Sequence, residues 1–204
     1  MRLFVAVDIA PEIRERIARF MEGMREFAPD ARWVKLDSFH ITLKFIGEKS
    51  AEEMDAIQRA LADIQSGPAT VSFRGTGFFP NPRSARVFWV GIEADPNLAA
   101  LADKVDKALA RLRIPREDHE FTPHLTLARG GDPRHPRGGS GRPQARPGDQ
   151  PSARFARVQQ KLANLAPPDF GAMTADEFFL YESKLSPAGA HYTKIARFPL
   201  VAPA

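Results

Sequence analysis

Two copies of one short pattern carry the residues best suited to chemistry. The segment HITL at 40–43 recurs as HLTL at 124–127, 84 positions later. Each copy lies in a β-type sequence, and side chains along a strand alternate between the two faces of its sheet. Histidine and threonine therefore share one face, while the aliphatic residues anchor the other face in the core. On neighbouring central strands, two imidazoles and two hydroxyls would converge.

A pair of converging histidines suits the hydrolysis of a phosphodiester. Imidazole has an ordinary pKa of about 6.5, so at neutral pH one ring can be protonated and the other neutral. One ring then takes a proton from water, and the other gives a proton to the departing oxygen. Hydroxyls of Thr42 and Thr126 would hold the non-bridging phosphate oxygens as charge builds on them. No metal is needed if the leaving group is activated, as in a strained 2′,3′-cyclic phosphate.

A zinc site is the competing interpretation, because pairs of histidines also bind zinc. The chain contains no cysteine, and neither motif has the spacing HExxH. Asp37 and Glu48 lie near the first motif in sequence but outside it. The sequence therefore predicts neither a metal site nor a cofactor.

Composition sets further limits on the class of protein. Among 204 residues, the formal net charge is +4, which is compatible with a polyanion such as RNA but does not identify one. No stretch approaches the roughly 18 apolar residues of a membrane span. The apolar N-terminal run is broken by Asp8 and is too short for a signal peptide. These features predict a cytoplasmic protein that is independent of membranes, and nothing indicates an obligate protein partner.

The elements that must position the motifs alternate between strands and helices. Composition and spacing predict strands at 2–9, 39–46, 69–79, 86–93, 120–128, 174–182 and 191–199, and helices at 11–27, at 51–65, from Asp95-Pro96 to about Leu112, and near 152–165. Ser50 and Glu53 form a capping box before the second helix. Interspersed helices and hairpin-like strand pairs indicate an α+β fold with mostly antiparallel sheet.

Residues 130–154 interrupt this pattern. The segment is rich in Gly, Pro and Arg, and its largest aliphatic residue is alanine. It cannot bury enough surface to offset the entropy of ordering, so we expect a flexible loop insertion. It is either a solvated insertion or a basic arm that touches RNA phosphates.

Taken together, the paired motifs resemble those of the 2H phosphoesterase superfamily. The segments RLFVAVDIAPEIR, FHITLKFIGE, FTPHLTLAR and FFLYESKLSPAGAHYTKIARFPL extend this likeness to the RNA 2′,3′-cyclic phosphodiesterase family, historically called 2′-5′ RNA ligases. The resemblance implies a single domain over 1–204 with two lobes. In it, two antiparallel sheets would be related by pseudo-two-fold symmetry around a central cleft, with helices on the outside.

The resemblance also implies a role for each motif residue. It implies hydrolysis of an RNA 2′,3′-cyclic phosphate end to a 2′-phosphate without a metal. His40 would be the proton donor to the 3′-oxygen, and His124 the proton acceptor that activates water. Thr42 and Thr126 would bind the phosphate.

Several residues outside the motifs are weaker candidates for contacting the substrate. Arg129 follows the second motif, where the family often has a basic residue, and it can clamp phosphate through its fork of donors. Lys44 is in phase with His40 if alternation continues, so it would either face the cleft mouth or be a solvated lysine, whereas Phe45 would lie in the core. Tyr192 and Tyr181 would either stack on a base or pack within the fold.

Two other functions are compatible with the same residues. The first is a reversible 2′-5′ RNA ligase or a phosphodiesterase acting on 2′-5′ linked oligonucleotides, since ligation reverses attack on the cyclic phosphate. The second belongs to a different class: a nucleotide- or RNA-binding module without turnover. Two intact proton carriers argue against the binding module, because binding alone needs neither.

Overall fold

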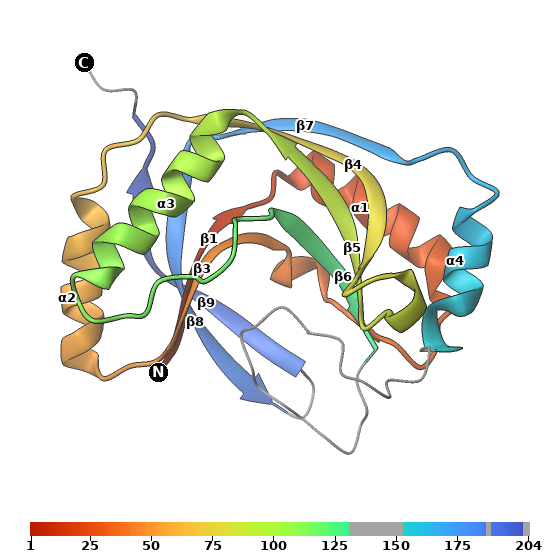
Figure 1. The fold of residues 1–204 in the computed structure, drawn as a ribbon, viewed down its shortest axis with the longest axis horizontal. Helices are drawn as coiled ribbons and strands as arrows, with labels where there is room; N and C mark the ends of the chain where they lie inside the picture. Colours follow the sequence, from red (N-terminus) through yellow and green to blue (C-terminus); the bar gives the residue numbers. More distant parts are fainter. Residues whose placement is uncertain (131–152, 187–188, 202–204) are drawn as a thin grey trace.

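The computed structural model describes residues 1–130, 153–186 and 189–201 (Figure 1). The predicted loop insertion at 130–154 therefore lies outside the described residues, apart from its two ends. Within the described residues, no helix is long and apolar enough to cross a membrane.

Strands and helices follow one another along most of the chain. The strands are β1 (Arg2–Asp8), β2 (Arg32–Trp33), β3 (His40–Glu48), β4 (Ala69–Phe79), β5 (Val87–Ala94), β6 (His124–Arg129), β7 (Asp169–Ala175), β8 (Glu177–Ser186) and β9 (Gly189–Pro199), and the helices are α1 (Pro11–Arg25), α2 (Ala51–Ala62), α3 (Pro96–Ala110) and α4 (Ala156–Leu162). Ser50 and Glu53 form the predicted capping box, and Asp95 caps α3 ahead of Pro96.

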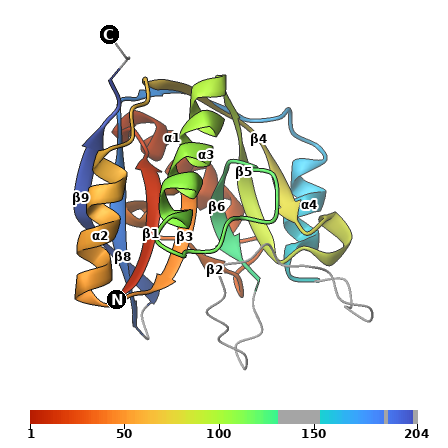
Figure 2. The same cartoon turned by 60° about the vertical axis from the view of Figure 1, so that its left-hand side comes forward.

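Two antiparallel sheets make up the framework. One has the strand order β3-β1-β8-β9 and the other the order β2-β6-β5-β4-β7. The edge strand β3 of the first sheet contacts β6 of the second. The helices lie around the sheets, with α2 and α4 at opposite ends of the molecule (Figures 1 and 2). The predicted α+β fold class, with two mostly antiparallel sheets and outer helices, is confirmed.

One prediction about the strands is wrong. Residues 174–182 form the end of β7 and the start of β8, which belong to different sheets. Ala175 pairs with Ala69 of β4, whereas Glu177 pairs with Pro199 of β9. The chain changes sheets at Asp176, whose carbonyl accepts a hydrogen bond from the Leu200 amide. Uniform β-type composition cannot reveal such a change of partner.

A strand-helix-strand unit occurs twice and gives the fold its pseudo-two-fold symmetry. In the first unit α1 joins β1 to β3, and in the second α3 joins β5 to β6. Asp8 is paired with His40 across β1 and β3, and Gly91 is paired with His124 across β5 and β6. The two motif histidines therefore occupy equivalent places in the two units.

Both sheets are anchored by one continuous hydrophobic core. Leu3, Val5 and Val7 of β1 enter this core, together with Ile41 and Leu125 from the two motifs. The alternate residues of β1 face the other way, where Phe4 and Ala6 join a small cluster with Phe179 and Tyr181. We call this second side, which also carries the motif histidines and threonines, the inner face. A single domain over residues 1–204 stays a prediction.

A bulge at the last residue of each motif reverses the alternation of side chains. In β3, Thr42 is paired with Ala6 and Lys44 with the next residue, Val5, so Leu43 is the extra residue. Lys44 is consequently buried with 3% of its surface exposed, whereas Phe45 is 39% exposed and lies beside Phe4 on the inner face. The predictions that Lys44 faces the cleft mouth and that Phe45 lies in the core are both wrong.

The second motif has the same bulge. Thr126 is paired with Trp89, and Ala128 with the neighbouring Phe88, so Leu127 is the extra residue. Arg129 is thereby placed on the inner face, in the position equivalent to Phe45.

Buried Lys44 joins β3 to the segment that leads to the second motif. Its Nζ donates to Asp106 of α3 at 2.7 Å and to the Pro115 carbonyl at 2.6 Å. Asp106 also accepts from Arg116 Nε at 2.8 Å. Burial alone would raise the pKa of Asp106, but the hydrogen bonds from Arg116 and Lys44 outweigh it and hold the pKa below its ordinary value.

Removing the negative charge of Asp106 should destabilise the protein. We expect Asp106→Asn to lower the free energy of unfolding by about 2 kcal/mol at pH 7, because it removes the buried carboxylate beside Lys44 and leaves only the exposed Glu117, 3.2 Å from Lys44 Nζ, as an opposite charge. Folding lowers the pKa of Asp106, so this stabilisation exists above the unfolded-state pKa and disappears as the pH falls through the folded-state pKa. Urea unfolding at pH 7 and at acidic pH measures both effects. The exposed Asp103→Asn variant is the control, and an equal cost in both variants would contradict the prediction.

Candidate active site

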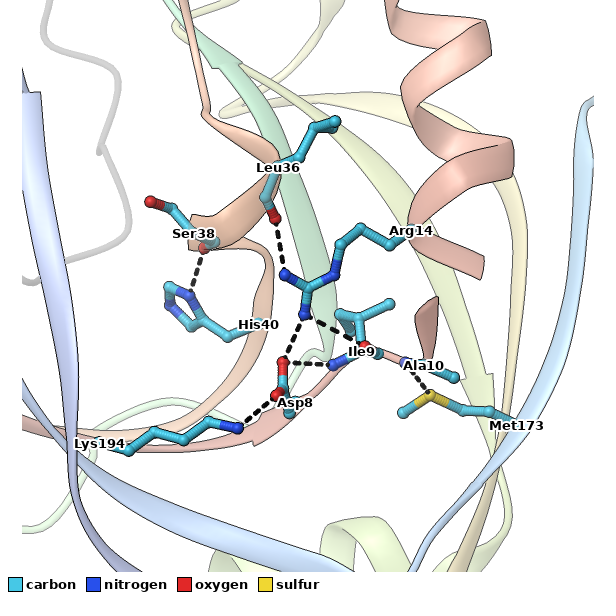
Figure 3. Close-up of polar contacts among 9 residues, drawn as sticks. All are labelled: Asp8, Ile9, Ala10, Arg14, Leu36, Ser38, His40, Met173 and Lys194. Carbon is cyan, nitrogen blue, oxygen red and sulfur yellow. Dashed lines mark hydrogen bonds and ion pairs between the residues drawn. The ribbon is translucent and has the colours of Figure 1, made fainter. Parts of the chain in front are cut away.

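His40 is the first residue of β3 and follows the short 3-10 turn Leu36–Ser38. Its Nδ1 lies 2.8 Å from the Ser38 carbonyl oxygen, as Figure 3 shows. A carbonyl can only accept a hydrogen bond, so Nδ1 carries a proton and donates it. In the neutral ring, Nε2 is then the nitrogen that can accept a proton.

His124 repeats this arrangement at the start of β6. Its Nδ1 lies 2.9 Å from the carbonyl oxygen of Thr122, which again is two residues earlier in the chain. Both rings are therefore held in the same tautomer by the same local contact. Such fixing of orientation and tautomer is what a proton-transferring histidine requires.

Electrostatic interactions link the two motif strands across the inner face. His40 is affected by the charges of His124 and Arg129, and Arg129 interacts in turn with Tyr192 of β9. Thr42 and Thr126 lie on the same face as the histidines, and both are half-buried. The structure thus places the four motif residues, Arg129 and Tyr192 on the inner face, whereas Lys44 lies on the opposite face.

The surroundings of His40 favour its neutral form. Burial is the largest effect and lowers the pKa of His40 to about 4, and the positive charge of Arg129 and the nearby His124 act in the same direction. The Ser38 hydrogen bond and the Asp8 carboxylate act in the opposite direction. In the free protein at neutral pH, His40 is therefore uncharged.

Aromatic side chains pack against both histidine rings. Phe4 lies 4.8 Å from the His40 ring and stacks on Tyr181 at 5.0 Å, while Tyr192 meets His40 edge-on at 5.2 Å. On the second sheet, Phe79 meets His124 edge-on at 4.9 Å. Burial raises the pKa of both tyrosines, so their hydroxyls stay protonated. Tyr181 is buried in this packing, whereas Tyr192 remains partly exposed.

Two residues of the inner face were not predicted from the sequence. Phe45 was assigned to the core because a bulge is invisible in one copy of the motif. Aligning the copies would have revealed it, since Arg129 occupies the position of Phe45 and an arginine is unsuited to a core. Asp8 was noted as an interruption of an apolar strand, yet it pairs with His40 across the sheet.

The possible metal ligands of the described residues do not cluster. Within the described part of the chain, no group of three or more His, Cys, Asp or Glu side chains is placed to hold a metal ion. Metal independence itself stays a prediction that an assay must test.

Comparison with known proteins gives a consistent result. The family model of LigT-like phosphoesterases matches residues 7–89 and 90–138. The RNA 2′,3′-cyclic phosphodiesterase of Archaeoglobus fulgidus is 31% identical over 97% of this chain and 99% of its own length, and that of Thermus thermophilus is 32% identical over 98% and 90%.

Solved structures extend the likeness to three dimensions. The crystal structure of TT0787 of Thermus thermophilus has a TM-score of 0.75 and 28% identity, covering 100% of both chains. Escherichia coli LigT in complex with 3′-AMP has a TM-score of 0.73 and 29% identity, covering 98% of this chain and 97% of LigT. Fold, paired motifs and relatives agree: the chain belongs to the LigT-like phosphoesterase family, within the 2H phosphoesterases.

The positive charge of Arg129 should contribute to lowering the pKa of His40. We expect NMR titration of the His40 ring to give a pKa near 4, and Arg129→Gln to raise it because a neighbouring positive charge is removed. Arg157→Gln on α4 serves as the control and should leave the His40 pKa unchanged. A His40 pKa that is insensitive to Arg129 would show that the two side chains do not interact.

Proposed function

We propose that this protein hydrolyses RNA 2′,3′-cyclic phosphate ends to 2′-phosphomonoesters without a metal. The observation that carries the proposal is the matched pair of His40 and His124, each fixed through Nδ1 by a backbone carbonyl. Relatives that align over nearly the whole chain and are named RNA 2′,3′-cyclic phosphodiesterases support the same reaction.

In the proposed reaction, each histidine moves one proton. His124 Nε2 takes a proton from water, and the water oxygen attacks phosphorus. The bond between phosphorus and the 3′-oxygen breaks, and His40 protonates that oxygen, leaving the phosphate on the 2′-oxygen. Loss of a proton from His124 to solvent restores the free protein, and His40 takes up a new proton when the next substrate binds.

Substrate binding prepares His40 for the role of acid. The free protein holds His40 neutral, partly because Arg129 repels a second positive charge. A bound phosphodiester anion would offset the Arg129 charge and raise the pKa of His40. Arg129, Thr42 and Thr126 would hold the non-bridging oxygens, with Arg129 offering two parallel donors.

The same residues also permit an alternative reaction, either 2′-5′ ligation or cleavage of 2′-5′ linked oligonucleotides. Identifying the reaction products distinguishes these activities from the opening of a cyclic phosphate. A silent RNA-binding module would instead bind RNA without forming product.

Location in the cytoplasm stays a prediction.

The decisive experiment is a product assay in the presence of EDTA. We expect the purified protein to open a 2′,3′-cyclic nucleotide to its 2′-phosphate, and His40→Ala and His124→Ala each to lower turnover by about 10²–10⁴-fold, the usual effect of losing a general acid or base. His119→Ala is the matched control, because His119 is exposed and lies outside both motifs. A strict metal requirement, a 3′-phosphate product, or near-normal activity in both variants would refute the proposal.

Arg32 extends the proposed RNA contact beyond the terminal phosphate. It is paired directly with Arg129 across β2 and β6, and no acidic group among the described residues forms an ion pair with either side chain. Like charges directly opposite each other are destabilising, so an RNA backbone phosphate would relieve this repulsion.

We therefore expect Arg32→Gln to raise the KM for a cyclic-phosphate oligonucleotide about tenfold, the effect of losing a charged hydrogen bond. The KM for a cyclic mononucleotide should not change, and the free energy of unfolding should rise slightly as the repulsion disappears. Steady-state kinetics on both substrates, with Arg111→Gln as a surface control, test this. Equal effects on the two substrates would show that Arg32 does not contact the RNA backbone.

A further inference from the structure

The strands that pair with the two motif strands, β1 and β5, differ at one pair of equivalent positions. Asp8 of β1 lies opposite His40, and Gly91 of β5 lies opposite His124. The histidines themselves are held alike, through Nδ1 and the carbonyl two residues earlier. One histidine therefore has a carboxylate as its cross-strand neighbour, and the other has no side chain there.

This difference is enforced by the backbone of the second sheet. A Cβ atom at Gly91 would lie 2.4 Å from the carbonyl oxygen of Arg74. Real Cβ atoms do not approach backbone oxygen so closely, and a backbone carbonyl in a sheet cannot move aside easily. A carboxylate equivalent to Asp8 consequently cannot be placed beside His124.

Asp8 is fixed in place by three donors, as Figure 3 shows. Its Oδ1 accepts from the Ile9 amide at 2.8 Å and from Arg14 Nη2 at 2.7 Å, and its Oδ2 accepts from Lys194 Nζ at 2.6 Å. Arg14 also donates to the carbonyl of Leu36, in the 3-10 turn that supplies the Ser38 carbonyl to His40. One set of contacts thus connects the carboxylate to the turn that orients His40.

The charged and titratable groups around His40 are unequal in their effects. Arg129 and His124 of β6 disfavour the imidazolium, whereas Asp8 of β1 favours it. The cations Arg14 of α1 and Lys194 of β9 are both paired with Asp8 and partly neutralise it. The hydroxyls of Tyr181 and Tyr192, from β8 and β9, stay uncharged.

We propose that Asp8 is the positioning residue that makes His40, rather than His124, the proton donor of this active site. This inference rests on the proposed function. The Asp8 carboxylate favours a proton on the ring that must give one away, and Gly91 cannot supply a carboxylate from the equivalent position opposite the other ring. Fixed by Arg14 and Lys194, Asp8 acts through His40 and does not itself contact the substrate.

Opposite charge changes around His40 provide the test. Loss of the donor's proton limits kcat at high pH, so the basic limb of the kcat profile reports the pKa of His40 in the substrate complex. Asp8→Asn removes the favourable charge and should move this limb by about 0.5–1 pH unit to lower pH. Lys194→Met unmasks the Asp8 charge and should move the limb to higher pH.

Conservative substitution separates the electrostatic role from a structural one. Asp8→Glu keeps the charge, so its basic limb should stay near that of the unaltered protein even if kcat or thermal stability falls. NMR titration of His40 in phosphate-saturated protein should show the same order of pKa values, with Lys194→Met highest and Asp8→Asn lowest.

The possible failures are distinct. If the unaltered protein does not open cyclic phosphates, the proposed function fails. If it turns over but the basic limb and the His40 pKa are the same in Asp8→Asn, Lys194→Met and the unaltered protein, Asp8 has a purely structural role and this inference is overturned.

Discussion

The extra leucine in each motif strand is the constraint on which the arrangement of the inner face depends. A regular strand would place every second residue after the histidine on the inner face and so would direct Lys44 there. Because Leu43 and Leu127 each occupy a bulge, the residue five positions beyond each histidine faces inward instead. Phe45 and Arg129 are therefore equivalent in backbone position but differ in chemistry, because one motif strand carries an apolar ring there and the other carries a cation.

The bulge at Leu43 also directs Lys44 toward α3 and the segment before β6, so that Lys44 connects the two strand-helix-strand units. Its ammonium group, directed away from the inner face, reaches Asp106 of α3 and the Pro115 carbonyl on the way to the second motif. A buried charge is tolerated only where opposite charges and hydrogen bonds surround it. The contact therefore fixes β3 relative to the segment leading into β6, and with it the relative positions of two histidines that are far apart in sequence.

In the proposed reaction the two histidines have different roles, although the fold places them almost symmetrically. Both rings are oriented by the same carbonyl contact and both pack against phenylalanine rings. Their cross-strand neighbours differ: Asp8 lies opposite His40, and Gly91, which cannot accept a side chain, lies opposite His124. The low pKa of free His40 fits this scheme, because an anionic substrate would supply the charge that completes the donor.

The sequence by itself determined the motif residues, their shared face, the α+β class and the helix caps, since these follow from local spacing and side-chain chemistry. Tertiary structure decided the rest. The predicted side-chain alternation was wrong at Lys44 and Phe45, because a bulge depends on the partner strand. The prediction of one strand over 174–182 was wrong because the chain changes its pairing partner at Asp176. Asp8 and Lys194 are separated by 186 positions, and their ion pair beside His40 arises from strand order, which no local pattern encodes.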